Sequence, residues 1–288
     1  MERRLIASMR AIAATAAAVS LVTTVTITGQ GNQQQPPVGG PDWTMPLTAH
    51  GDPDIEGRWV ERSDVTTYSI QAGIADREEH TRIGGQRPQG GEPIQTPDAR
   101  IPYLPWAADF ADFLHEQHYG AWTGAYLDPV SRGLMEGVPR QHYQGAMEIY
   151  QFPDYISVSY TYGHEYRIIY TDGRPHPPSN VKLWMGDSRG HWEGDTFVSE
   201  VTNLNGQAWF DIVGSFSTDA LTLAERWKFS GPERIDYEVT MTDPNTYREP
   251  WTMVMVLAKT EYEEMWPSEV WEGTVIADTD SLSIRPPQ

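Results

Sequence analysis

The sequence predicts a mainly β protein built around a single antiparallel β-barrel with one or two short helices. Three observations favour this fold class. Apolar and polar residues alternate with a period of two from residue 145 onward. Turn-forming residues interrupt the alternation at short intervals, as between the strands of a meander. Only one segment after the N-terminal region spaces its apolar residues as a helix does.

The N-terminal region predicts an export signal over residues 1–30. Three arginines, Arg3, Arg4 and Arg10, precede an apolar run from Ala11 to Ile27. A membrane anchor is the alternative, but this run is at the lower limit for spanning a bilayer. Residues 31–50 are polar and rich in Pro and Gly, which is typical of a flexible linker. We therefore expect a barrel domain over residues 51–276 and a C-terminal tail over 277–288, in a periplasmic or secreted protein without stable membrane insertion.

The elements follow from local patterns. A turn at Asp52–Asp54 leads into a short strand around Trp59, and residues 73–105 have the composition of a loop. Trp106, Phe110 and Leu114 recur at helical spacing, so a helix is expected over 105–119. Residues 186–195 predict a loop with a short strand. The predicted strands of the meander are 145–152, 155–161, 164–171, 196–202, 220–229, 234–242 and 251–260. A closed barrel of about eight strands is wide enough to hold one small ligand.

The alternation also assigns faces. In 220–229, Glu225 shares a face with the apolar Leu223 and Trp227. A carboxylate on such a face must be paired or must have a raised pKa, so Glu225 is either part of a structural pair with an arginine or catalytic. The same alternation places His164 in an aromatic stripe with Tyr162, Tyr166, Ile168 and Tyr170, as a core histidine or a functional one.

Dense motifs lie between Arg167 and Thr252: RIIYTDGRPHPP, WMGDSRGHWEGDTFVSEVTNLN, DALTLAERW and YEVTMTDPNTYREPWT, with GDPDIEGRW upstream. In these motifs the chain resembles a large, mostly uncharacterised family of exported bacterial proteins. The resemblance implies a lipocalin-like antiparallel β-barrel. The chain departs from the family pattern at Thr161, where members often have a glutamate, and it lacks two cysteines that members tend to carry.

Composition excludes several function classes. The formal net charge of -19 argues against binding to nucleic acids or anionic lipids. The absence of cysteine removes disulfides, thiolate metal sites and cysteine nucleophiles. No glycine-rich nucleotide loop followed by a helix is present, so no organic cofactor is expected. Ser188 lies in a G-D-S-R-G string, but the β-type segments around it do not provide the strand–turn–helix setting of a nucleophile elbow.

Three functions remain open. The first is a cofactor-independent acid–base enzyme, of lyase, isomerase or hydrolase type, acting on a small aromatic or apolar molecule. Its expected catalytic residues are His164, Glu225, His176 and Arg167. The residues expected to bind the substrate are Tyr166, Tyr170, His118, Tyr119, Trp122, Trp209, Trp227 and Trp251.

The second function is a non-catalytic carrier that uses the same pocket. The third is a metal-dependent hydrolase, with His164, His176 and His191 beside Glu165 or Glu193. No metal-binding motif supports this third function, and we expect no metal in the site. The expected partner is the small molecule, and a homodimer is left open.

Overall fold

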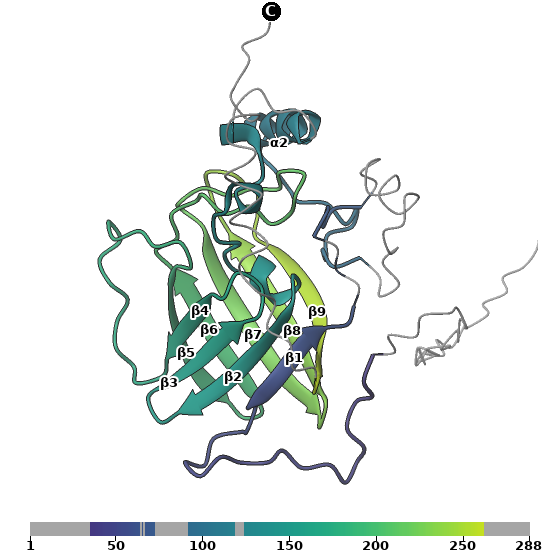
Figure 1. Ribbon diagram of the computed structural model, residues 1–288, viewed down its shortest axis with the longest axis vertical. Coiled ribbons are helices and arrows are strands. Elements are labelled where there is room, and N and C mark those ends of the chain that lie inside the picture. Colours follow the sequence, from purple (N-terminus) through teal and green to yellow (C-terminus); the bar gives the residue numbers. More distant parts are fainter. Residues whose placement is uncertain (1–34, 64, 66, 73–91, 119–123, 262–288) are drawn as a thin grey trace, which may run out of the picture. The chain divides into compact units, whose positions relative to one another are not determined.

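The barrel is closed and has nine strands. The computed structural model describes residues 35–63, 65, 67–72, 92–118 and 124–261. Within these residues the strands follow one another around the barrel in chain order (Figure 1). Their bounds are β1 Gly57–Glu61, β2 Ala146–Phe152, β3 Tyr155–Tyr160, β4 Tyr166–Tyr170, β5 Asp187–Glu193, β6 Thr196–Thr202, β7 Thr222–Gly231, β8 Arg234–Thr242 and β9 Trp251–Lys259. The prediction of a single, mainly β barrel is confirmed.

One strand pair departs from the expected antiparallel pattern. Strands β4 and β5 pair in parallel, and over only two residue pairs, Ile169 with Ser188 and Tyr170 with Arg189. Parallel neighbours need a crossover connection, so the segment between Tyr170 and Asp187 returns to the end of the barrel where β4 begins. The barrel is therefore mixed, and every other neighbouring pair is antiparallel.

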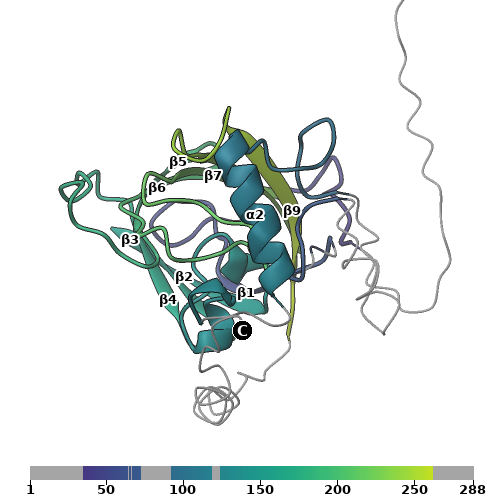
Figure 2. The ribbon, with the colours of Figure 1, turned by 90° about the horizontal axis from the view of Figure 1, so that it is seen from above.

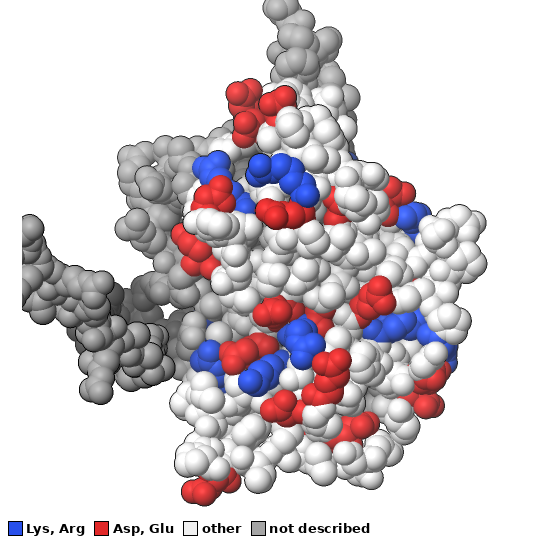
Figure 3. Space-filling view, turned by 180° about the vertical axis from the view of Figure 1, so that it is seen from behind, with Lys and Arg blue, Asp and Glu red and all other residues white. Residues whose placement is uncertain are grey.

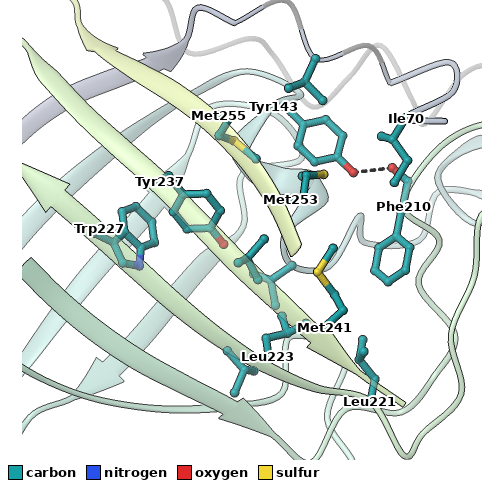
Figure 4. Close-up of a cluster of buried hydrophobic side chains, with 14 of the residues drawn as sticks. Ile70, Tyr143, Phe210, Leu221, Leu223, Trp227, Tyr237, Met241, Met253 and Met255 are labelled. Atoms are coloured by element: carbon teal, nitrogen blue, oxygen red, sulfur yellow. Dashed lines mark hydrogen bonds between the residues drawn. The ribbon is translucent and has the colours of Figure 1, made fainter. Parts of the chain in front are cut away.

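The inner face of the barrel is packed with large side chains. Along β7 the buried positions alternate as expected, with Leu223, Glu225, Trp227 and Phe229 inside. Figure 4 shows Trp227 and Leu223 from β7 beside side chains of β8 and β9 in this core. Tyr143 joins the core from a loop and donates its hydroxyl to the carbonyl of Phe210. Burial of this apolar surface is the main stabilising contribution to the barrel.

A helix and three short 3-10 segments cover the end of the barrel that we call the mouth, formed by the turns at 161–165, 203–221 and 243–250. Helix α2 (Pro105–Gln117) lies at this end (Figures 1 and 2) and buries Ala107 and Leu114. The 3-10 segments are η1 (Gly124–Tyr126), η2 (Val130–Arg132) and η3 (Arg140–His142). All three residues of η3 are buried, so this segment packs into the mouth of the barrel.

The start of the described chain packs against the opposite end of the barrel. Gly39 donates its N–H to the carbonyl of Ser230 at 2.7 Å, and Trp43 stacks on Phe229 with ring centroids 6.0 Å apart. Both residues belong to the predicted linker. The predicted signal (1–30) and tail (277–288) lie outside the described residues.

The described surface carries both signs of charge. On the face shown in Figure 3, acidic and basic side chains lie next to one another. None of the helices in the described part of the chain has the length and hydropathy needed to cross a membrane.

Candidate functional site

An arginine–glutamate pair lies at the centre of the barrel. Arg167 on β4 and Glu225 on β7 form two hydrogen bonds, Nη1 to Oε1 at 2.8 Å and Nη2 to Oε2 at 2.5 Å. Glu225 also accepts hydrogen bonds from Ser199 Oγ at 2.6 Å and from the Tyr237 hydroxyl at 2.8 Å. Arg167 Nε donates to Ser188 Oγ at 2.8 Å. Both charged side chains are thus buried and hydrogen-bonded, as the sequence required for a carboxylate on this face.

The electrostatics of this pair indicate a structural role. Burial alone would raise the pKa of Glu225, but the charge and hydrogen bonds of Arg167 outweigh it and hold that pKa below its usual value. His142 lies 3.5 Å from Glu225 through Nε2, and its ring packs on Trp227 and Tyr237. Burial lowers the pKa of His142 to about 3, so the imidazole is neutral at physiological pH. Near neutral pH, Glu225 therefore stays ionised and His142 stays neutral, so neither side chain exchanges a proton there.

A cavity opens in the barrel wall where β4 and β5 separate. These strands share only two residue pairs, and the cavity lies beside the start of β4 and the segment that leads into β5. This wall cavity has a volume of about 510 Å³. Its described lining combines apolar and polar side chains: Met135, Tyr166, Ile168, Tyr170, Leu183, Trp184 and Met185, with His164, Glu165, Arg167, Asp187 and Ser188. Such a mixture is typical of small-molecule sites.

Glu165 is a lining carboxyl group whose pKa is raised well above its ordinary value. Its side chain is only 9% exposed, and Oε2 accepts a hydrogen bond from Gln141 Nε2 at 2.6 Å. The backbone N–H of Glu136 also donates to its carboxylate. Burial raises the pKa of Glu165 to about 7, although both hydrogen bonds oppose this rise. A carboxyl group with this pKa can accept or donate a proton at neutral pH.

The structure brings four of the predicted site residues to the wall cavity: His164, Arg167, Tyr166 and Tyr170. Their arrangement differs from the prediction. His164 lies exposed in the turn before β4 with φ +52°, and Tyr166 is 70% exposed. The predicted aromatic stripe is therefore the outer face of β4. Arg167 and Ile169 face inward instead, because Arg167 pairs with Glu225 inside the barrel.

His176 lies at the rim of the wall cavity. Its Nδ1 is 2.7 Å from Oδ1 of Asp187, a lining residue, and Asp187 also pairs with Arg189 at 2.9 Å. The Arg189 and Arg174 guanidinium groups lie over the Tyr170 ring, at 4.7 and 4.2 Å from its centroid. These contacts hold the loop after β4 against the outer wall.

The remaining predicted residues do not line the wall cavity. Trp227 and Trp251 are core residues, and Trp209 is buried in the loop after β6. His118, at the end of α2, contacts the Tyr68 hydroxyl through Nε2 at 2.8 Å. Tyr119 and Trp122 lie outside the described residues.

Sequence reasoning did not single out the raised pKa of Glu165, nor the apolar lining from Trp184 and Met185. Glu165 was considered only as a metal ligand. The signal that identifies it is its spacing of two residues from Arg167, which places both side chains on the inner face of the same chain segment. No comparable signal marks Trp184, because its segment has no periodic pattern.

The histidine cluster that the alternative metal-dependent hydrolase would need is not formed in the described part of the chain. That part contains no group of three or more histidine or acidic side chains placed to hold a metal ion. His191 is exposed and lies 3.4 Å from Glu193, whereas His176 is held by Asp187. These residues do not fit a metal ion that needs three protein ligands.

Comparison with known proteins adds no assignment. No protein-family model matches the chain, and no curated protein matches it significantly.

Proposed function

We propose that this protein is an exported, cofactor-independent acid–base enzyme that binds a small aromatic or apolar molecule in the wall cavity. The observation that carries the proposal is the Glu165 carboxyl group, with a pKa raised to about 7, in the lining of a cavity of about 510 Å³. The apolar lining would hold the substrate, and Glu165 would remove or return a proton. This chemistry suits a lyase, isomerase or hydrolase without an organic cofactor.

Export and the family resemblance belong to the same proposal. The N-terminal arginines and apolar run support export to the periplasm or secretion. The closed barrel agrees with the fold that the family resemblance implies. Binding to nucleic acid is not part of the proposal, because the acidic chain would repel a phosphate backbone.

A non-catalytic carrier is the second candidate, and the central ion pair favours it. The Arg167–Glu225 pair is saturated by internal hydrogen bonds, so it offers no group to a substrate. Among the described residues that line the wall cavity, Glu165 then remains the one with a pKa raised toward neutrality. A carrier would use the same apolar lining and return its ligand unchanged.

The two candidates differ in what happens to the ligand. The mature protein, a Glu165→Gln variant and a Glu233→Gln control are each incubated with a small-molecule extract of the producing cells. Glu233 is an exposed residue in the turn between β7 and β8, so its substitution removes a charge far from the wall cavity. Mass spectrometry then follows every compound over time.

If the protein is an enzyme, the mature protein and the Glu233→Gln control should each convert at least one compound of the extract into a product. The Glu165→Gln variant should lose that conversion. The rate should change through pH about 7, where Glu165 titrates. A compound that binds all three proteins and is recovered unchanged supports the carrier. Equal conversion by Glu165→Gln contradicts the proposed role of this residue.

A further inference from the structure

The side chain of Ser188 connects the central ion pair to the wall cavity. Ser188 is the buried residue near the start of β5, and its Oγ lies 2.8 Å from Arg167 Nε. It is also one of the residues that line the wall cavity. Since Ser188 is buried, a ligand can reach it only from within this cavity. The function proposed above does not use this residue.

The Ser188 hydroxyl has a hydrogen left to donate. A guanidinium N–H can only donate, so Ser188 Oγ is the acceptor of the bond from Arg167. Within the described part of the chain, no residue accepts the hydrogen of this hydroxyl. Buried donors nearly always have a partner, so the unused donor calls for a ligand that accepts.

Ser199 provides the contrast to Ser188. Its hydroxyl is buried beside the same ion pair, but it donates to Glu225 Oε2 at 2.6 Å, so its hydrogen is already used. Ser199 is not among the described residues that line the wall cavity. Of these two serines, only Ser188 therefore combines an unused donor with a place at the cavity.

Arg167 makes the Ser188 hydroxyl a fixed and strong donor. The positive charge at Oγ polarises the O–H bond, and hydrogen bonds in such a chain strengthen one another. The guanidinium group cannot shift, because its other two nitrogens hold Glu225. Arg167 is not a base that could remove the hydroxyl proton, so this contact does not activate Ser188 as a nucleophile. A donor held in this way suits an oxygen on which negative charge develops.

The acid–base group of the wall cavity lies on the other side of Arg167. Glu165 precedes Arg167 by two residues, so both side chains point to the same face of the chain segment. Glu165 and Ser188 both line the wall cavity. One cavity thus contains a proton acceptor and a hydrogen-bond donor, which are the two groups needed to remove a proton next to a carbonyl group.

We propose that the wall cavity takes a small ketone with an aromatic or apolar body, and that Ser188 donates a hydrogen bond to the carbonyl oxygen of this ligand. The apolar lining, which includes Met135, Ile168 and Leu183, surrounds the rest of the molecule. Binding through Ser188 needs no chemistry, whereas the reaction of the bound ketone rests on the acid–base function proposed above. Arg167 is a positioning residue, because it acts on the ligand only through Ser188.

The reaction that this arrangement supports is enolisation. The Glu165 carboxylate takes a proton from the carbon beside the carbonyl group, and the electron pair of that C–H bond forms a C=C bond. The electron pair of the C=O double bond moves to the oxygen, where the Ser188 hydroxyl stabilises the negative charge. Return of the proton to carbon restores the carboxylate and yields the starting ketone or an isomer. No oxidant, reductant or second substrate is consumed.

Acetophenone and α-methylstyrene test the binding step, because they have nearly the same shape and only acetophenone has a carbonyl oxygen. Their dissociation constants are measured for the mature protein and for Ser188→Ala, Ser188→Thr and Ser199→Ala. Ser199→Ala is the matched control, because it also removes a buried hydroxyl beside the ion pair. Near-ultraviolet circular dichroism verifies the fold of each variant.

We expect Ser188→Ala to weaken the binding of acetophenone by about tenfold and to leave α-methylstyrene within about twofold. Ser188→Thr, which keeps the hydroxyl, and Ser199→Ala should retain the affinity for acetophenone. Infrared spectra of carbonyl-labelled acetophenone should show a lowered stretching frequency in the mature protein and a return toward its value in hexane in Ser188→Ala. The proposal is overturned if the frequency is the same in both proteins, if Ser188→Ala and Ser199→Ala weaken binding equally, or if acetophenone does not bind at millimolar concentrations.

Hydrogen exchange separates this inference from the proposed function. In D₂O, the mature protein should exchange the methyl hydrogens of acetophenone for deuterium, as followed by mass spectrometry. Ser188→Ala should slow this exchange by about a hundredfold. Glu165→Gln should abolish the exchange and keep the lowered carbonyl frequency. Binding through Ser188 without exchange in the mature protein would support the ketone site and contradict the acid–base function.

Discussion

Glu225 shows what a buried charge requires of the residues around it. It is almost wholly buried and satisfied by Arg167, Ser199 and Tyr237. Taking both charges of the ion pair out of water is costly, so the pair stabilises the barrel only while both partners are present. Removing one partner leaves the other as an uncompensated charge in the core.

A double-mutant cycle tests this account of the ion pair. Arg167→Met or Glu225→Met alone should lower the free energy of unfolding by about 3–5 kcal/mol, because each leaves one buried charge unpaired. The double variant should be destabilised by much less than the sum of the two, since no buried charge remains. Urea unfolding of the four proteins measures this, and additive single effects would show that the two side chains do not depend on each other.

At the residue scale, the sequence predicted the pairing of Glu225 but not the raised pKa of Glu165. Glu225 could be identified because it is a charged residue on an otherwise apolar face. A buried charge needs a partner whichever strands are neighbours, so this prediction did not depend on the strand order. On β4 both faces carry large side chains, so alternation alone left open which face is inside. The partner of Glu225 is Arg167, whose side chain therefore points into the barrel. Because side chains alternate along the strand, Glu165 and Ile169 also face inward and His164 faces outward.

The wall cavity depends on an element that sequence patterning identified poorly. Strand β5 has seven residues, of which only Ser188 is buried, and Gly190 lies at its centre. A Cβ atom at Gly190 would lie 2.4 Å from the Phe197 ring, so glycine is required there for close packing rather than for a turn. The bounds of β2, β3, β6, β7, β8 and β9 were predicted to within about three residues, because alternation of buried and more exposed positions dominates most of these strands. No local sequence pattern predicts the parallel pairing of β4 and β5.

Gly186 fixes the entry of the chain into β5, and its substitution tests this geometry. Gly186→Ala should destabilise the protein by about 1–3 kcal/mol more than Gly173→Ala. Both glycines have positive φ, +68° and +74°, so both substitutions share the backbone cost. Only at Gly186 would the added Cβ meet other atoms, at 2.6 Å from Val201 and 2.7 Å from the Thr202 carbonyl. Thermal unfolding compares the two variants, and equal losses would contradict the close packing at Gly186.

The whole molecule binds or releases protons on folding in two pH ranges. Glu136 and Glu165 have pKa values of about 9 and about 7 in the folded protein, above their ordinary value of 4.5. Folding therefore takes up protons between pH about 5 and 9, and the stability from these groups is lost as the pH rises. His142 behaves oppositely, because its lowered pKa makes folding release a proton as the pH falls from 6.5 toward about 3.

The free energy of unfolding should therefore decrease as the pH rises from about 6 to 9. Glu136→Gln should flatten this decrease, because glutamine does not titrate and keeps the shape of the neutral acid. Urea unfolding at several pH values in this range measures both curves. A wild-type stability that is constant or rises over this range, or an unchanged slope in Glu136→Gln, would contradict the buried, neutral state of Glu136.

The fold class followed from sequence at this scale, whereas the site did not. A long period-two pattern with regular turns has few solutions other than a barrel or a sandwich, and the structure is a closed barrel. The wall cavity arises where two strands part and a distant segment with Trp184 and Met185 lies beside them. That juxtaposition depends on strand order and crossover, which a single sequence does not encode locally.

The titration of Glu165 tests the central claim most directly. Carbon-detected NMR of the labelled mature protein follows the side-chain carboxyl carbons from pH 4 to 9, and the Glu165→Gln variant assigns the signal by its absence. We expect a midpoint near pH 7, because burial at the wall cavity opposes ionisation. A midpoint in the ordinary range of a glutamate, near 4.5, would show a solvated carboxylate and would contradict an acid–base role for the wall cavity.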